Sequence, residues 1–299
     1  MAEAAEAAGA QAAPEEARDG RVDTPDRHEA FVTMVTNDDF VIGAEVLLHS
    51  LREHCGSTKS RAGQPRRRPL VVMITPGVSQ SKRQVLQAAA DDIIEVEPIA
   101  VPIQKGEGTG HVPSWAQVGE YRHRCCCYTK LRLWGLTQYD RVVYVDADAL
   151  VMQDLGELFD REVDFAAAPD VFPPDKFNAG VMVVVPSRVV LDDMLSKVEE
   201  TPTYDGGDTG FLNAYFSDWF SRPAAARLPF AYNALRTVYW TTHDKNPGYW
   251  ESIGPVKVIH FCSSPKPWEE AKRKGDLEIL WWQRYVHMKM GSVAAVGGF

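Results

Sequence analysis

Apolar residues follow two patterns that alternate along most of the chain. Short, nearly continuous apolar runs are typical of buried strands, and apolar residues three or four positions apart are typical of helices. The run 30–35 (AFVTMV) opens the series. Residues 41–54 follow it and place Val41, Ala44 and Leu48 on one face, which predicts a helix.

The same two patterns predict further elements as far as residue 260. Strands are expected at 70–74, 93–96, 141–145, 165–168, 181–185 and 256–260, and helices at 79–90, 126–136, 187–200 and 208–220. Strands that are apolar on both faces and alternate with helices indicate an α/β fold, with a mostly parallel sheet covered by helices on both faces. Ligands of such sheets bind beyond the carboxyl ends of the strands, so residues that directly follow a strand are the first candidates for chemistry.

Three parts are expected along the chain. Residues 1–29 are rich in Ala and acidic residues and predict a disordered leader. Residues 30–268 hold the strands and helices of one globular domain. Residues 269–299 are expected to form a helical extension packed on that domain; a membrane anchor is the less favoured alternative because the basic excess of residues 271–290 is small. The glycine-rich stretch 106–110 does not lie between a strand and a helix and predicts a flexible loop.

Charge and cysteine content narrow the class of protein. The 299 residues carry a formal net charge of −9, whereas nucleic acids and anionic membranes bind basic surfaces. Neither is therefore expected as a partner. The N-terminus lacks the basic start and apolar core of a secretory signal, which favours a cytoplasmic protein. Five cysteines, three of them contiguous at 125–127, fit neither a disulfide framework nor a zinc site, so we expect free thiols.

Polar residues follow three of the predicted strands. Thr36 and Asn37 follow the first strand, Asp146 and Asp148 follow the strand at 141–145, and His260 ends the last strand. Two carboxylates and an imidazole suit Mn²⁺, with Mg²⁺ as the alternative. A D-x-D pattern is weak evidence by itself, because an Asp-rich turn and a structural histidine would give the same sequence.

A series of motifs carries a family resemblance. In order along the chain they are FVTMVTND (31–38), TKLRLW (129–134), QYDRVVYVDADALV (138–151), APD (168–170), FNAGV (177–181), DGGDTG (205–210), LPFAYN (228–233) and HFCSSPKPW (260–268). Together they resemble the glycogenin-like members of glycosyltransferase family 8. The resemblance implies a single Rossmann-like domain of the GT-A type, a divalent metal, a UDP-sugar donor and retention of the anomeric configuration, which gives an α-linkage.

The resemblance also assigns roles to residues. The metal ligands would be Asp146, Asp148 and His260, where the cation stabilises the leaving diphosphate as a Lewis acid. The nucleotide would contact Met34, Thr36, Asn37, Phe40, Asp146, Ala147, Asp148, Ser263 and Lys266. The transferred sugar and the acceptor would contact Lys130, Asp170, Asn178, Asp205, Asp208 and Thr209, of which Lys130, Asp205 and Asp208 would be catalytic. A structural alternative for residues 205–208 is a turn with Asp208 as the N-cap of the next helix, and the two roles are compatible.

Departures from the family pattern concern the acceptor. Thr209 stands where glycogenins have Gln, and the position of their self-glucosylated tyrosine falls on Trp240, one residue after Tyr239. These differences favour a hexosyltransferase that moves galactose or glucose from a UDP-sugar to a glycan on a separate cytoplasmic protein. A self-glucosylating primer of glycogen synthesis is the alternative, and a sugar-nucleotide-binding scaffold without turnover is a third hypothesis. The family also implies a homodimer.

Overall fold

The computed structural model describes residues 27–56, 58–59, 65–102, 124–125, 127–171, 173, 175–269 and 275–296. The expected leader as far as residue 26 and the glycine-rich stretch 106–110 lie outside this part of the chain. Among the described residues, no helix combines the length and the apolar character needed to cross a membrane.

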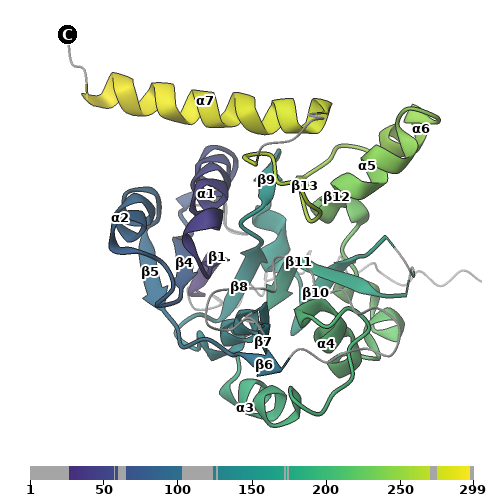
Figure 1. Cartoon of the computed structure of the whole chain (residues 1–299). Coiled ribbons are helices and arrows are strands. Elements are labelled where there is room, and N and C mark those ends of the chain that lie inside the picture. The colour runs from purple at the N-terminus through teal and green to yellow at the C-terminus, as the bar shows by residue number, and fades with distance from the viewer. Residues whose placement is uncertain are drawn as a thin grey trace, which may run out of the picture.

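A six-stranded sheet forms the centre of the molecule (Figure 1). Across the sheet its strands are β10 (Phe165–Pro169), β11 (Phe177–Val184), β8 (Arg141–Val145), β1 (Glu29–Val35), β4 (Leu70–Ile74) and β5 (Asp92–Glu95). Strands β8, β1, β4 and β5 pair in parallel, whereas β11 runs antiparallel to both β8 and β10. The prediction of a mostly parallel sheet is confirmed.

Successive residues of the central strands enter two different hydrophobic cores, as the strand period requires. One core packs Val32, Met73 and Val142 against one group of helices: η4 (Cys127–Gly135), α3 (Arg188–Lys197) and α4 (Asp208–Tyr215). The other core packs Phe31, Val72 and Val143 against a second group: α1 (Val41–Cys55), α2 (Gln80–Ala89) and η5 (Gly156–Asp160). Helices therefore cover both faces of the sheet.

A smaller sheet and a third core lie beside α1. The sheet has the order β12 (Ala234–Leu235), β13 (Val258–His260) and β9 (Ala149–Val151). Helix α7 (Asp276–Val296) lies across α1 and this sheet (Figure 1), and it buries Leu277 and Trp281 against Val46 and Leu150. The shorter elements of the described chain are β2 (Thr58–Lys59), β3 (Pro65–Arg66), β6 (Val101–Pro102), β7 (Arg124–Cys125), η1 (Asp38–Phe40), η6 (Trp219–Ser221), η7 (Ala224–Ala226), η8 (Phe230–Asn233), α5 (Arg236–Thr242) and α6 (Pro247–Glu251).

Several predicted elements differ from the observed ones. The segment predicted as a helix at 126–136 is a 3₁₀ helix, and the helix predicted at 208–220 ends at Tyr215. Strand β11 starts at Phe177, four residues before the apolar run that predicted it, because Asn178 pairs with Ala168 and Gly180 belongs to the strand, although neither is a typical strand residue. Strands β9 and β12 and helices α5 and α6 were not predicted, since two to seven residues are too few to show a period.

The N-terminal boundary of the fold lies before residue 30. Glu29 is the first residue of β1 and pairs with Arg141, so the expectation that it belongs to a disordered leader is wrong. Its buried carboxylate accepts a hydrogen bond of 2.8 Å from Nε of Arg68. The guanidinium of Arg68 also lies 4.2 Å above the ring of Phe159. A buried ion pair thus holds the start of the central strand.

This ion pair gives a prediction for truncated proteins. Deleting residues 1–26 should leave the melting temperature unchanged, because this segment has little apolar surface to bury. Glu29→Gln should lower the free energy of unfolding by about 2 kcal/mol, because a charge-assisted hydrogen bond is lost in the interior. Thermal unfolding of the truncated protein and urea titration of Glu29→Gln, each compared with wild type, measure these effects. Equal midpoints for wild type and Glu29→Gln would contradict the role of the pair.

Candidate active site

Three side chains that could hold a cation meet where β8 and β13 end. Asp146 and Asp148 directly follow β8, and His260 is the last residue of β13. Nε2 of His260 lies 3.2 Å from a carboxylate oxygen of Asp148 and 3.7 Å from one of Asp146. One ligand atom from each of the three residues lies within 4.8 Å of the others. The topology therefore brings together residues that are more than a hundred positions apart in the sequence.

The orientation of His260 is set by two asparagines. Nδ2 of Asn233 donates to Oδ1 of Asn178 at 2.9 Å, so Oδ1 of Asn233 faces Nδ1 of His260 at 2.8 Å as an acceptor. His260 therefore carries a proton on Nδ1, and in the neutral ring Nε2 presents its lone pair to the two carboxylates. Support of this kind is typical of metal-binding histidines.

A glycine in β11 makes room for the histidine ring. A Cβ on Gly180 would lie 2.3 Å from Cε1 of His260. The carbonyl of Gly180 also accepts a hydrogen bond of 2.8 Å from the amide of Asp146. The backbone of β11 thus holds Asp146, the start of the acidic turn (residues 146–148), and lies directly beside the imidazole.

Lys130 links Asp146 to a second carboxylate. Its Nζ lies 2.7 Å from Asp208 and 3.1 Å from Asp146, and it donates to the carbonyl of Ala179 at 3.2 Å. Burial alone would lower the pKa of Lys130, but the charges of Asp146 and Asp208 outweigh it and raise the pKa above its ordinary value. Lys130 is thus a permanent cation in the interior of the site.

Lys266 neutralises the other carboxylate of the acidic turn. Its Nζ donates to Asp148 at 2.5 Å and to the carbonyl of Phe261 at 2.9 Å. Burial acts to raise the pKa of Asp148, but Lys266 and His260 hold it well below its ordinary value. Asp146 differs, because burial raises its pKa despite the opposing charge of Lys130. The hydroxyl of Tyr144 also donates to Asp146, at 2.6 Å.

The loop before α4 carries two further acidic residues. Asp208 is not the N-cap that the sequence suggested: Gly207 is the N-cap, and Asp208 is the first helical residue, with its carboxylate toward Lys130. Oδ1 of Asp205 accepts hydrogen bonds from the amides of Gly207 at 2.8 Å and Gly210 at 3.0 Å. Burial raises the pKa of Asp205 to about 6, although these hydrogen bonds oppose the rise.

These groups surround one cavity of 390 Å³. Its wall contains every site residue expected from the sequence except Ser263. The expected residues on the wall are Met34, Thr36, Asn37, Phe40, Lys130, Asp146, Ala147, Asp148, Asp170, Asn178, Asp205, Asp208, Thr209, His260 and Lys266, and four unexpected ones are Cys127, Tyr144, Tyr204 and Cys262. Tyr144 could have been recognised, because it precedes Asp146 by two residues and so shares its side of the strand.

Ser263 is held away from the cavity wall by a buried arginine that sequence reasoning missed. Arg236, which is fully buried at the start of α5, donates to Oγ of Ser263 at 2.9 Å and to the carbonyl of Pro265 at 2.9 Å. It also forms an ion pair of 2.8 Å with Glu278 of α7. Arg236 therefore connects α5, α7 and the segment that leads to Lys266.

The cysteine expectation needs one correction. Cys127, on the cavity wall, is disulfide-bonded. The prediction that all five cysteines are free thiols is therefore wrong for Cys127. Cys55 and Cys262 are free, as expected, and burial raises the pKa of Cys262 to about 11.

Solved structures share the fold of this chain. Glycosyltransferase GlyE of Streptococcus pneumoniae TIGR4 superimposes with a TM-score of 0.61 at 18% identity, covering 90% of this chain and 64% of that one. Galactosyltransferase LgtC, solved in complex with donor and acceptor sugar analogues, gives a TM-score of 0.58 at 18% identity, with 87% and 95% of the two chains covered. The fold is that of the GT-A glycosyltransferases.

Sequence comparison makes the assignment more specific. Residues 31–272 match the family described as "Glycosyl transferase family 8". Glycogenin-1 of Homo sapiens is 35% identical over 272 residues, which cover 85% of this chain and 71% of that protein. Glycogenin-1 of Mus musculus is 37% identical over 242 residues, 80% of this chain and 65% of its own length. The chain belongs to glycosyltransferase family 8 and is a glycosyltransferase similar to the glycogenins.

The buried Arg236–Glu278 pair gives a prediction for stability. Arg236→Met should lower the free energy of unfolding by about 3–5 kcal/mol, because it leaves a carboxylate in the interior without its cation. The double variant Arg236→Met, Glu278→Leu should regain part of this loss, because both charges are then absent. Urea unfolding of the single variants and the double variant measures the coupling. Simple addition of the two single losses would contradict it.

Proposed function

We propose that the protein is a retaining, metal-dependent hexosyltransferase that uses UDP-galactose or UDP-glucose. The observation that carries the proposal is the cluster of Asp146, Asp148 and His260 beside Lys130 and Lys266 in one cavity. Lys130 and Lys266 supply cationic groups beside the carboxylates of Asp146 and Asp148. Two basic groups and a cation site suit a ligand with several negative charges, such as a nucleoside diphosphate.

The side chains fit a divalent cation. Two carboxylates offer oxygen ligands, and the contact with Asn233 leaves the Nε2 lone pair of His260 facing them. This mixed oxygen and nitrogen set suits Mn²⁺, with Mg²⁺ as the alternative. When bound, the cation supplies Lewis-acid stabilisation of the leaving diphosphate.

Lys266 and Lys130 have separate roles in the proposed reaction. Lys266 is on a segment fixed by Arg236, and its Nζ, now on Asp148, is within reach of a diphosphate bound at the acidic turn. Lys130 cannot easily give up its proton, so it acts as a fixed charge that orients Asp208. Thr36, Asn37 and Phe40 follow β1 on the cavity wall, where the nucleoside would lie.

The acidic residues before and at the start of α4 stabilise the sugar. A glycosidic bond that breaks leaves positive charge on the anomeric carbon, which carboxylates stabilise. Asp205 and Asp208 supply these charges, and Asp170 and Asn178 bind sugar hydroxyls. Asp205 is ionised above about pH 6, so its contribution falls as the pH drops below that value. Retention arises by front-face attack or through a covalent intermediate.

The acceptor that we propose is a glycan on a separate cytoplasmic protein. Tyr239 is buried, its hydroxyl donates to Asp276 at 3.0 Å, and its ring stacks on His243, as expected of a packing residue. Relatives named galactinol synthase 6, at 29% identity, and inositol phosphorylceramide glucuronosyltransferase 1, at 31%, both from Arabidopsis thaliana, indicate that the acceptor varies among relatives. A homodimer, as in the glycogenin-like members, is part of this proposal.

A metal-ligand variant tests the reaction. Asp148→Asn should lower hydrolysis and transfer of the UDP-sugar by about a hundredfold or more at saturating Mn²⁺, because the cation loses a charged ligand. Asp192→Asn is the matched control, since Asp192 is an exposed acid of α3 that pairs with Arg188. Activity of Asp148→Asn within twofold of the control would contradict the assignment.

The acceptor is tested by intact mass. The purified protein is incubated with Mn²⁺ and either UDP-glucose or UDP-galactose, and hexose additions of about 162 Da are counted, the residue mass expected for α-glycosyl transfer. We expect none on wild type or on Tyr239→Phe, and transfer to an added glycan acceptor by both. Hexose that accumulates on wild type and disappears in Tyr239→Phe would instead identify a self-glucosylating primer. Peptide mapping would distinguish it from modification of the exposed Tyr204 or Tyr249.

A further inference from the structure

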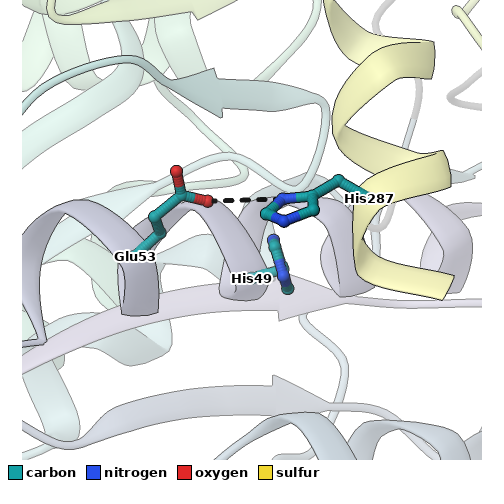
Figure 2. Close-up of side chains that lie close together, drawn as sticks. All are labelled: His49, Glu53 and His287. Carbon is teal, nitrogen blue, oxygen red and sulfur yellow. Dashed lines mark ion pairs between the residues drawn. The ribbon is translucent and has the colours of Figure 1, made fainter. Parts of the chain in front are cut away.

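A second group of metal-ligating side chains lies between α1 and α7, in a different part of the fold from the acidic turn. His49 and Glu53 project from α1 and His287 from α7, so that the three side chains face one another (Figure 2). One ligand atom of each lies within 4.8 Å of the others, and Nδ1 of His287 is 3.9 Å from a carboxylate oxygen of Glu53. The rings of His49 and His287 meet edge to face at 5.6 Å.

Helical spacing explains why these side chains share one space. His49 and Glu53 are four residues apart, which places them one above the other on the same face of α1. Helix α7 faces this side, where Lys289 pairs with Glu45 at 2.8 Å and Arg284 pairs with Glu53. A pair of ligands on one helix and a third from a neighbouring helix can surround one ion.

Nδ1 of His49 is shielded from solvent and has no hydrogen-bond partner among the described residues. A shielded polar atom of this kind calls for an explanation, and an ion is one of those that proteins use. An imidazole nitrogen that makes no hydrogen bond is available as a metal ligand.

We propose that His49, Glu53 and His287 form a zinc site that joins α7 to α1. Two imidazoles and one carboxylate are a ligand set that Zn²⁺ takes with a fourth, open position for water. Bonds of about 2.1 Å in a tetrahedral site place ligand atoms roughly 3.4 Å apart. The present spacing is at most 4.8 Å, so binding of an ion draws the ligand atoms closer together. The two imidazoles favour zinc over the Mn²⁺ that suits the acidic turn.

Arg284 is the cation that competes with zinc for Glu53. It pairs with that carboxylate and also contacts Nε2 of His54 at 3.3 Å. Binding of zinc requires Glu53 to exchange this partner for the ion. Removing the guanidinium should consequently tighten zinc binding, whereas it would only weaken the packing of α7 if the cluster were purely structural.

The experiment measures zinc binding by equilibrium dialysis with elemental analysis, and the melting temperature with and without zinc. All variants carry Asp148→Asn, so that the acidic turn lacks one ligand. One bound zinc ion and a raised melting temperature are expected in this background, because an ion that binds only the folded state stabilises it. His49→Ala and His287→Ala should each weaken binding about tenfold or more, and Arg284→Gln should strengthen it several-fold.

Lys289→Ala is the matched control, because it removes another contact between α1 and α7 without touching a ligand. It should bind zinc as the background does. Equal zinc affinity in His49→Ala, His287→Ala and the background overturns the proposal. So does a loss in Lys289→Ala as large as that in His287→Ala, or a failure of the background to bind zinc. These measurements do not depend on sugar transfer. A failure of the zinc proposal can therefore be distinguished from a failure of the proposed function.

Discussion

The structure depends on placing several carboxylates in one partly buried cavity. Asp146, Asp148 and Asp208 are close enough to repel one another, and removing each of them from water is unfavourable without a compensating cation. Lys130 and Lys266 provide that compensation, and each reaches a different carboxylate from a different element. The pKa values of Asp146 and Asp148 shift in opposite directions, because burial and the charges of Asp148 and Asp208 raise that of Asp146, whereas Lys266 and His260 lower that of Asp148. A divalent cation would add positive charge where the carboxylates already converge.

The topology of the two sheets brings the residues of this cavity together. Strand β11 runs against its neighbours, so its first residues, not its last, lie at the edge where β8 ends. Asn178 and Gly180 thereby support His260 from the start of a strand, Asn178 by accepting a hydrogen bond from Asn233 and Gly180 by leaving room for the imidazole ring. His260 arrives from the second sheet, whose β9 continues directly from the acidic turn. The turn after β8 of the large sheet and β13 of the small sheet thus supply the ligands.

The order of the main strands and helices could be predicted from sequence because apolar periodicity reports burial directly. The acidic turn and His260 were also accessible, since they stand at strand ends. Arg236 was not, because the residues around it give no sign of the distant carboxylate, Glu278, against which it is fully buried. The same holds for Ser263, whose side chain Arg236 draws from the cavity wall, and for Glu29, whose acidic neighbours in sequence concealed its place in β1. These residues depend on partners distant in the chain, which local patterns do not record.

The pairing of β1 with β8 has a consequence for how the chain folds during synthesis. Phe31 lies beside Val143, so the central pair of the sheet forms only after nearly half of the chain has been made. Strand β13 and Lys266 follow more than a hundred residues after β8, and until they emerge Asp148 lacks both His260 and its lysine. The acidic turn therefore remains hydrated while the rest of the sheet assembles. Contacts of such long sequence separation are slow to form, which makes closure of the cavity a late event in folding.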